Sequence, residues 1–127
     1  MPRTLPHHKA VFVVDDDPSM LKGMRRLLRQ YGFETVPFET AKALREHGDF
    51  DQAFCIVLDV NLSDGSGIDL RLHLTESGVA LPVIYITGND SHATRMAAMA
   101  SGCLAYLTKP FTAQSLIEPI ERAAALA

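Results

Sequence analysis

The sequence predicts an α/β domain in which a five-stranded parallel β-sheet is covered by helices on both faces. Short apolar runs alternate five times with segments of helical periodicity along the 127 residues. The run at residues 53–58 is continuously apolar, as is typical of a central strand with both faces covered. No linker-like, low-complexity or repeated segment breaks the alternation, so a single doubly wound domain is expected.

The first β-then-α unit shows most clearly how the elements are bounded. The apolar run Ala10–Val14 predicts a strand that ends at Asp15. Asp17 is a typical helix N-cap, and Pro18 suits the first helical position, where its missing N–H costs nothing. Apolar residues at three- and four-residue steps then predict a helix that ends at Gly32.

The other four units follow the same plan. Four further strands are expected at residues 33–37, 53–58, 81–86 and 103–107. Each precedes a predicted helix, at residues 40–47, 67–77, 91–100 and after residue 112. Thr112 can cap the last helix. Pro119 lies inside that helix and predicts a kink, because proline removes one backbone hydrogen bond.

Composition limits the classes of function. Hydrophobic residues make up 47% of the chain, and the net charge of −3 gives no reason to expect direct nucleic-acid binding. No apolar stretch approaches the roughly 20 residues of a membrane span. Residues 1–9 contain no apolar signal core, and we expect them to be an N-terminal tail before a domain at 10–127. A cytoplasmic protein is expected.

Cysteine and histidine placement gives little sign of a soft-metal site. Cys55 and Cys103 lie in apolar runs and are interpreted as reduced core thiols, with a disulfide as the alternative. The five histidines show no helical metal-ligand spacing, so we expect surface residues and no zinc. They are His7, His8, His47, His73 and His92.

Polar side chains occur where the predicted strands end. Asp15 and Asp16 follow the first strand, Asp59 the third, Thr87 the fourth and Lys109 the fifth. The carboxyl ends of parallel strands meet at one edge of the sheet, where such folds bind ligands. Three converging carboxylates repel one another, and a hard cation such as Mg²⁺ relieves that repulsion. With an ammonium and a hydroxyl beside them, the set fits phosphoryl transfer to a carboxylate.

Each acidic or polar residue also has an ordinary structural interpretation. Asp17 is better explained as a helix cap than as a ligand. Asp64 and Asp69 are expected to be solvated loop and helix-face residues. Thr87 alone would be an unremarkable strand-end residue, and Lys109 alone a surface lysine. Their combination at the strand ends of one sheet favours a common site.

Four segments resemble the receiver domain of two-component response regulators. In this order and at these spacings the resemblance is specific, and it covers about Lys9 to Ala125. The segments are Val13–Asp17, Val57–Leu62, Ile86–Gly88 and Tyr106–Phe111. The first helix and residues 38–44 most resemble the FixJ subfamily. The resemblance implies a flavodoxin-like sheet with strand order 2-1-3-4-5.

The resemblance also implies roles for the acidic residues. Asp59 would be the phosphorylated nucleophile and a metal ligand. Asp16 would bind Mg²⁺ (or Mn²⁺) directly, Asp15 would bind it through a water, and Asn61 would offer its backbone carbonyl.

The remaining roles concern the phosphoryl group and the switch. Thr87 would donate a hydrogen bond to a phosphoryl oxygen, and Lys109 would form an ion pair with it. Tyr106 matches the switch aromatic that turns inward as Thr87 moves. The Lys109–Pro110 bond would be cis, which is otherwise a minority state.

The chain departs from the family pattern after the acceptor. Leu62-Ser63 stands where many relatives have Met-Pro, so a somewhat more mobile loop is expected. The side chains of Asn61 and Asn89 lie where relatives tune the lifetime of the phosphoryl group.

The resulting hypothesis is a phosphorelay receiver. A sensor histidine kinase or a histidine phosphotransfer protein would supply the phosphoryl group, and the chain would catalyse only its own phosphorylation and dephosphorylation, not act as an enzyme on other substrates. The altered surface around the fourth helix, fifth strand and fifth helix would regulate a downstream protein, an output domain or homodimerisation. Whether the chain is a stand-alone regulator or a piece of a longer one stays open.

Two other classes use similar residues. A phosphatase of the haloacid dehalogenase type has an Asp nucleophile, a Thr, a Lys and metal-binding acids, but its nucleophile comes first and its acid pair late. Here the acid pair comes first. A pseudo-receiver that only binds partners is the other alternative, and the complete acid and lysine set argues against it.

Overall fold

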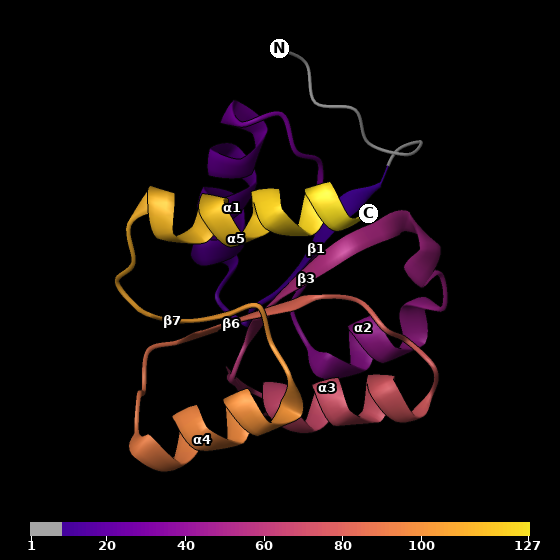
Figure 1. Cartoon of the computed structure of the whole chain (residues 1–127), viewed down its shortest axis with the longest axis vertical. Helices are drawn as coiled ribbons and strands as arrows, with labels where there is room; N and C mark the ends of the chain where they lie inside the picture. The colour runs from indigo at the N-terminus through magenta and orange to yellow at the C-terminus, as the bar shows by residue number, and fades with distance from the viewer. Residues whose placement is uncertain (1–8) are drawn as a thin grey trace.

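A five-stranded parallel β-sheet lies between two layers of helices in the computed structural model, which describes residues 9–127 (Figure 1). The strands are β1 Ala10–Val14, β2 Thr35–Phe38, β3 Ala53–Asp59, β6 Val83–Thr87 and β7 Ala105–Thr108. Their order is β2-β1-β3-β6-β7, and all four neighbouring pairs are parallel. The predicted doubly wound fold and strand order are confirmed. The expected tail, Lys9 apart, lies outside the described residues.

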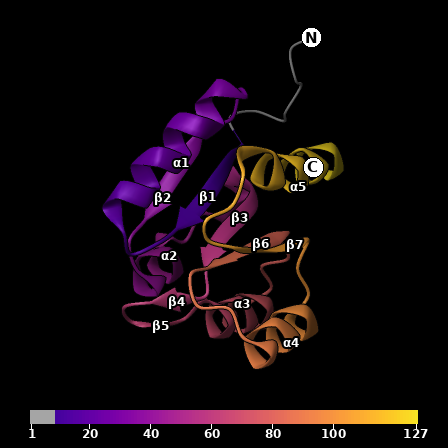
Figure 2. The same ribbon diagram turned by 90° about the vertical axis from the view of Figure 1, so that its left-hand side faces the viewer.

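Two helices cover one face of the sheet and three cover the other (Figure 2). The first layer holds α1 Pro18–Gln30 and α5 Ala113–Leu126, and the second holds α2 Ala41–His47, α3 Gly67–Glu76 and α4 His92–Ser101. Each layer encloses its own cluster of buried apolar side chains. Among residues 9–127, none of the helices is both long and apolar enough to cross a membrane.

The sequence correctly predicts the caps that begin α1 and α5 and the glycine that follows α1. The Asp17 carboxylate accepts the Ser19 N–H at 2.9 Å at the start of α1. Gly32, at φ 85°, follows α1 in the left-handed conformation that glycine adopts without strain. Thr112 accepts the Ser115 N–H at 3.1 Å at the start of α5.

Three strands begin two residues later than predicted. Phe33 donates its N–H to the Leu28 carbonyl and so belongs to the end of α1, and β2 begins at Thr35. Pro82 has no N–H to donate, and β6 begins after it at Val83. The fifth strand likewise runs from Ala105, where 103 was predicted.

A short hairpin occupies the segment after the third strand, where a loop was predicted. Its strands are β4 Asn61–Leu62 and β5 Gly65–Ser66, paired antiparallel across a turn at Ser63 and Asp64. Gly65 has φ 147°, a conformation that side-chain-bearing residues rarely adopt. The expected mobility of this loop stays a prediction, although the pairing argues against it.

Helix α5 continues through Pro119 to Leu126, so the proline does not end the helix. Its ring is buried, which gives it a packing role that the sequence did not suggest. The bend that Pro119 predicts in the helix axis stays a prediction.

Both cysteines are free, as predicted. Cys55 is fully buried, and burial raises the pKa of its thiol. Cys103 is half-buried, with its sulfur 3.8 Å from that of Met99.

The prediction of a surface position is wrong for His47. Its ring packs edge-on against Phe12 and Phe38, with centroids 5.2 Å away in both pairs. Its Nε2 is buried without a hydrogen-bond partner among residues 9–127. The cause is that the last turn of α2 lies over the aromatic side of β1 and β2. His73 and His92 are exposed as expected, while His7 and His8 lie outside the described residues.

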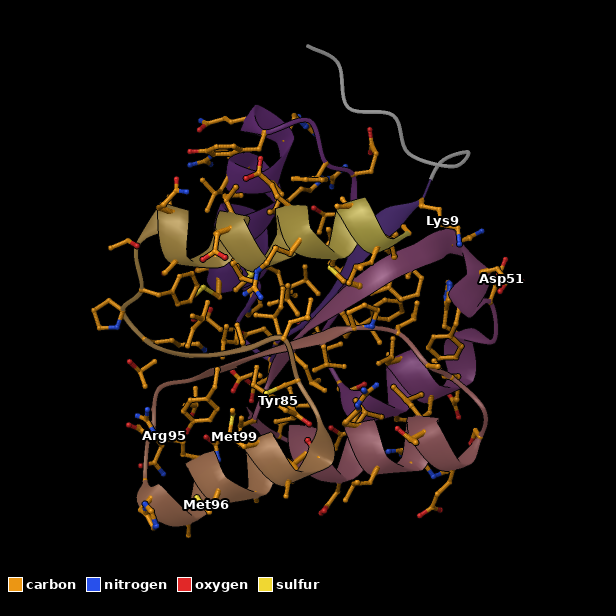
Figure 3. The ribbon with its side chains drawn as sticks, viewed as in Figure 1. Lys9, Asp51, Tyr85, Arg95, Met96 and Met99 are labelled. Carbon is orange, nitrogen blue, oxygen red and sulfur yellow. The ribbon has the colours of Figure 1, made fainter. Side chains whose placement is uncertain are left out.

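Helix α4 packs on the sheet through very little apolar surface. Ala98 is its one buried residue, all of α4 being described, whereas Met96 and Met99 are 57% and 60% exposed. Figure 3 shows both methionines and Arg95 along this helix, and Tyr85 within the sheet. The Tyr85 hydroxyl lies 2.7 Å from the Ser101 hydroxyl and adds a polar tie to the helix end.

Candidate functional site

Three carboxylates meet at the carboxyl edge of the sheet. Asp15 and Asp16 directly follow β1, and Asp59 is the last residue of the neighbouring strand β3. One oxygen from each lies within 4.8 Å of the others. Asp15 and Asp59 are buried and Asp16 is exposed. The structure therefore brings together the acids that the sequence predicts to converge, in a set of oxygen ligands suited to a hard divalent cation.

Lys109 reaches this acid cluster from beyond β7. Its ammonium donates to Asp59 Oδ2 at 2.9 Å and to Asp15 Oδ2 at 3.1 Å. Partial burial lowers the pKa of Lys109, but the hydrogen bonds to Asp59 and Asp15 outweigh it, so the net pKa lies above the usual value. One ammonium faces three carboxylates, so the cluster keeps an excess of negative charge.

Burial has the largest effect on the pKa of Asp15. It raises the pKa of this carboxyl above the usual value, although the Asp17 N–H and Lys109 both donate to the carboxylate and lower it. The repulsion from Asp59 adds to the rise. The charged form of Asp15 is therefore costly in this structure, and a further positive charge beside it would be stabilising.

Thr87 and Asn61 connect the acid cluster to the next strand. The buried Thr87 hydroxyl donates to Asn61 Oδ1 at 3.1 Å and accepts the Asn89 N–H at 3.0 Å. The Asn61 N–H donates to Asp59 Oδ1 at 2.9 Å. Asn61 is thus bonded to Asp59 through its backbone and to Thr87 through its side chain.

The backbone around the cluster is tightly set. A Cβ on Gly67 would overlap the backbone oxygen of Asp59, so α3 can begin this close to β3 only with glycine there. The Gly67 N–H donates to the Val60 carbonyl at 2.8 Å. On the other side, the Lys109 N–H donates to the Thr87 carbonyl at 2.7 Å, and the Lys109–Pro110 peptide is cis, as the resemblance implied.

Tyr106, on β7, contacts two residues that follow β6 in the chain, Asp90 and Arg95. Its hydroxyl donates to Asp90 Oδ1 at 2.9 Å. Arg95 pairs with Asp90 Oδ2 at 2.6 Å and lies with its guanidinium carbon 5.2 Å from the Tyr106 ring centre. Desolvation, followed by the hydrogen bond to Asp90 and its charge, raises the pKa of Tyr106 to about 12.

The family profile of the response regulator receiver domain matches residues 11–121. This chain belongs to that family. The match favours a receiver domain over the dehalogenase-type phosphatase that uses similar residues.

Curated relatives of this receiver domain include proteins named as response regulators and as transcriptional regulatory proteins. Nodulation protein W of Bradyrhizobium diazoefficiens is 36% identical over 110 residues, which are 87% of this chain and 48% of that protein. The transcriptional regulatory protein FixJ of Rhizobium meliloti is 30% identical over 113 residues, 89% of this chain and 55% of that protein. The chain spans about half the length of the curated relatives it matches.

Solved structures give the same family. The response regulator StyR superposes with a TM-score of 0.85 at 38% identity, over 94% of this chain and 60% of that one. The structure FixJ-N superposes with a TM-score of 0.85 at 29% identity, over 96% of this chain and 98% of that one. FixJ therefore appears in both comparisons, in line with the subfamily that the sequence resembles.

Asp64 of this receiver domain has a role that sequence reasoning missed. It is not simply a solvated loop residue, since its carboxylate accepts the N–H groups of Ala41 and Lys42 at 2.9 and 3.0 Å. These two hydrogen bonds lower the pKa of Asp64. The partners lie 23 and 22 residues away in sequence, so no local pattern could have revealed the contact.

Proposed function

We propose that Asp59 of this receiver domain accepts a phosphoryl group from a phosphohistidine on a sensor histidine kinase or a histidine phosphotransfer protein. One observation carries the proposal. Asp59 ends the central strand among two further carboxylates, with the Lys109 ammonium 2.9 Å from its Oδ2. A nucleophilic carboxylate with matched positive charge is the arrangement that phosphoryl transfer to aspartate requires.

The residues present also fit Mg²⁺ or Mn²⁺. The acid cluster offers three carboxylates against the single ammonium of Lys109, and Mg²⁺ prefers such oxygen ligands. Asp16, Asp59 and the Asn61 carbonyl would hold the ion, with Asp15 acting through a water. When bound, the ion supplies positive charge to the phosphoryl oxygens.

The residues of the chain have separate tasks in the transfer. A carboxylate oxygen of Asp59 forms a bond to phosphorus as the phosphorus–nitrogen bond breaks, and the electron pair of that bond leaves with the imidazole of the donor. Lys109 balances charge on the phosphoryl oxygens, and Thr87 donates its hydroxyl to one of them. Water later attacks phosphorus and releases phosphate from Asp59. The chain acts on its own aspartate only.

The same step would move the output surface. The phosphoryl group draws the Thr87 hydroxyl away from Asn61, Tyr106 leaves Asp90 and turns inward, and the surface of α4, β7 and α5 changes. This surface would regulate a downstream protein, an output domain or pairing with a second copy. We place residues 10–127 in this domain and the protein in the cytoplasm, without direct contact to nucleic acid or membrane.

Intact-mass measurement tests the proposal. The protein is treated with a small phosphodonor and Mg²⁺, and the wild type should gain the mass of one phosphoryl group. Asp59→Asn should gain none, because the nucleophile is gone. Asp69→Asn, which removes an exposed acid of α3 outside the cluster, should gain it as the wild type does.

Two outcomes would contradict the assignment. Phosphoryl uptake by Asp59→Asn would show that another residue is the acceptor. A wild type that neither gains phosphate nor binds Mg²⁺ would instead indicate a pseudo-receiver that only binds partners.

A further inference from the structure

The β4–β5 hairpin carries Asn61 at its beginning and Asp64 in its turn. Asn61 lies at the acceptor, where its N–H donates to Asp59 and its side chain accepts from Thr87. Asp64 lies at the other end of the hairpin, over the start of α2. Figure 2 shows the hairpin beside α2 at the lower edge of the sheet. The hairpin therefore bridges the proposed phosphoryl site and a helix that contributes no residue to that site.

Asp64 uses both carboxylate oxygens in this bridge. Oδ1 accepts the Ala41 N–H at 2.9 Å, and Oδ2 accepts the Lys42 N–H at 3.0 Å. The third N–H of the helix, from Ala43, goes to the hydroxyl of the local cap Thr40 at 3.0 Å. The first three free N–H groups of α2 are thus divided between a local cap and a distant one.

Further contacts attach the hairpin to the second helical layer. Leu62 is buried in the same apolar cluster as Ala41 and Leu44 of α2. Ser66 ends the hairpin and caps α3 by accepting the Ile68 N–H at 3.1 Å. Without Asp64, the turn would keep one apolar anchor and the start of α3 but lose its two charge-assisted hydrogen bonds.

We infer that Asp64 is a positioning residue, which holds the hairpin against α2 and thereby fixes the Asn61 carbonyl and side chain at the phosphoryl site. This inference rests on the proposed function. Groups that orient a metal ligand act on affinity without touching the ion. Loss of Asp64 should therefore loosen Asn61 and weaken binding of Mg²⁺, although Asp64 itself is no ligand.

The rival interpretation is that Asp64 merely stabilises α2. Thr40→Ala is the matched control, because it removes a cap from the same helix end and leaves the hairpin bonded. Asp64→Asn is the conservative variant, because the amide keeps one acceptor oxygen for the two N–H groups.

The experiment compares wild type, Asp64→Ala, Asp64→Asn and Thr40→Ala. NMR titration of the unphosphorylated proteins gives the Mg²⁺ dissociation constant, hydrogen exchange reports the Asn61 amide, and urea unfolding gives stability. Asp64→Ala and Thr40→Ala should both lower stability. Asp64→Ala alone should weaken Mg²⁺ binding, by about tenfold, the lower end of the usual cost of losing a ligand-orienting partner. It should also speed exchange of the Asn61 amide, and Asp64→Asn should recover part of both losses.

Equal Mg²⁺ affinity in Asp64→Ala and Thr40→Ala would overturn the inference and leave Asp64 a helix cap. A wild type that binds Mg²⁺ but gains no phosphate would overturn the proposed function. The Mg²⁺ dissociation constants of the Asp64 and Thr40 variants would still decide whether Asp64 is a positioning residue. A wild type that fails to bind Mg²⁺ would overturn both.

Discussion

The Thr87 hydroxyl donates to Asn61 Oδ1 at 3.1 Å. Under the proposed function, a phosphoryl oxygen on Asp59 needs the same hydroxyl, so Asn61 and the phosphoryl group compete for one donor. The hydrogen bond to Asn61 thus stabilises the unphosphorylated arrangement.

Removing this competitor should favour the activated state. Asn61→Ala deletes the acceptor but keeps the backbone carbonyl. A neutral hydrogen bond contributes about 0.5–1.5 kcal/mol, so the apparent affinity for a phosphoryl mimic such as beryllofluoride should rise by about 2- to 12-fold. NMR titration with the mimic in the presence of Mg²⁺ measures this apparent affinity. Ser63→Ala, an exposed position in the same hairpin, is the control. Unchanged or weaker affinity in Asn61→Ala would refute the competition.

Lys109 should matter for stability as well as chemistry. Lys109→Met removes the ammonium between buried Asp15 and Asp59, and leaving a buried charge unpaired costs about 3–5 kcal/mol, less here because Lys109 is partly exposed. Urea unfolding should therefore show a loss of about 2 kcal/mol in the variant without metal. Added Mg²⁺ should stabilise the variant more than the wild type, because it supplies the missing positive charge. Equal stabilisation of the two proteins would count against this electrostatic account.

Two glycines should respond in opposite directions to the same substitution. Gly67→Ala drives a methyl group into the Asp59 backbone and should cost about 1–3 kcal/mol in unfolding free energy. Gly23→Ala, in α1, meets no atom within 4 Å and should add about 0.5–1 kcal/mol through helix propensity. Urea unfolding of both variants measures the contrast. A neutral Gly67→Ala would mean that α3 can shift away from β3.

The contact between Tyr106 and Asp90 should be visible in alkaline titration. The phenol has a pKa raised from 10.0 to about 12, so its contribution to stability is complete below pH 10.0 and is lost as pH rises through about 12. Asp90→Ala removes the hydrogen bond and the negative charge and should lower this pKa toward 10.0. Absorbance titration measures the pKa of Tyr106. The titration curve of Tyr106→Phe is subtracted to remove the signals of Tyr31 and Tyr85. An unchanged pKa would show that Asp90 does not hold the phenol in solution.

Sequence reasoning located the acid cluster because the relevant signals are local. Asp15 and Asp59 each end a continuous apolar run, and the geometry of a parallel sheet then brings strand ends to one edge. The caps Asp17 and Thr112 were predictable for the same reason, since a cap bonds within its own first turn.

The contacts that were missed join residues far apart in the chain. The sequence around Asp64 indicates only a polar turn residue. The start of α2 comes into contact with Asp64 only in the folded chain. In the sequence, His47 looks like the polar end of a short helix, yet aromatic rings from β1 and β2 pack against it. Polar residues in such positions carry no periodic signal.

The sparse packing of α4 leaves this helix free to vary. Because Ala98 alone is buried, substitutions along the rest of α4 cost the core almost nothing. The acceptor chemistry lies at the ends of β1, β3, β6 and β7. The first three of these strands are buried along their whole length, and Lys109, after β7, is held by its hydrogen bonds to Asp15 and Asp59. Descendants of such a domain can therefore acquire new binding partners through α4 while the reaction at the strand ends is inherited intact.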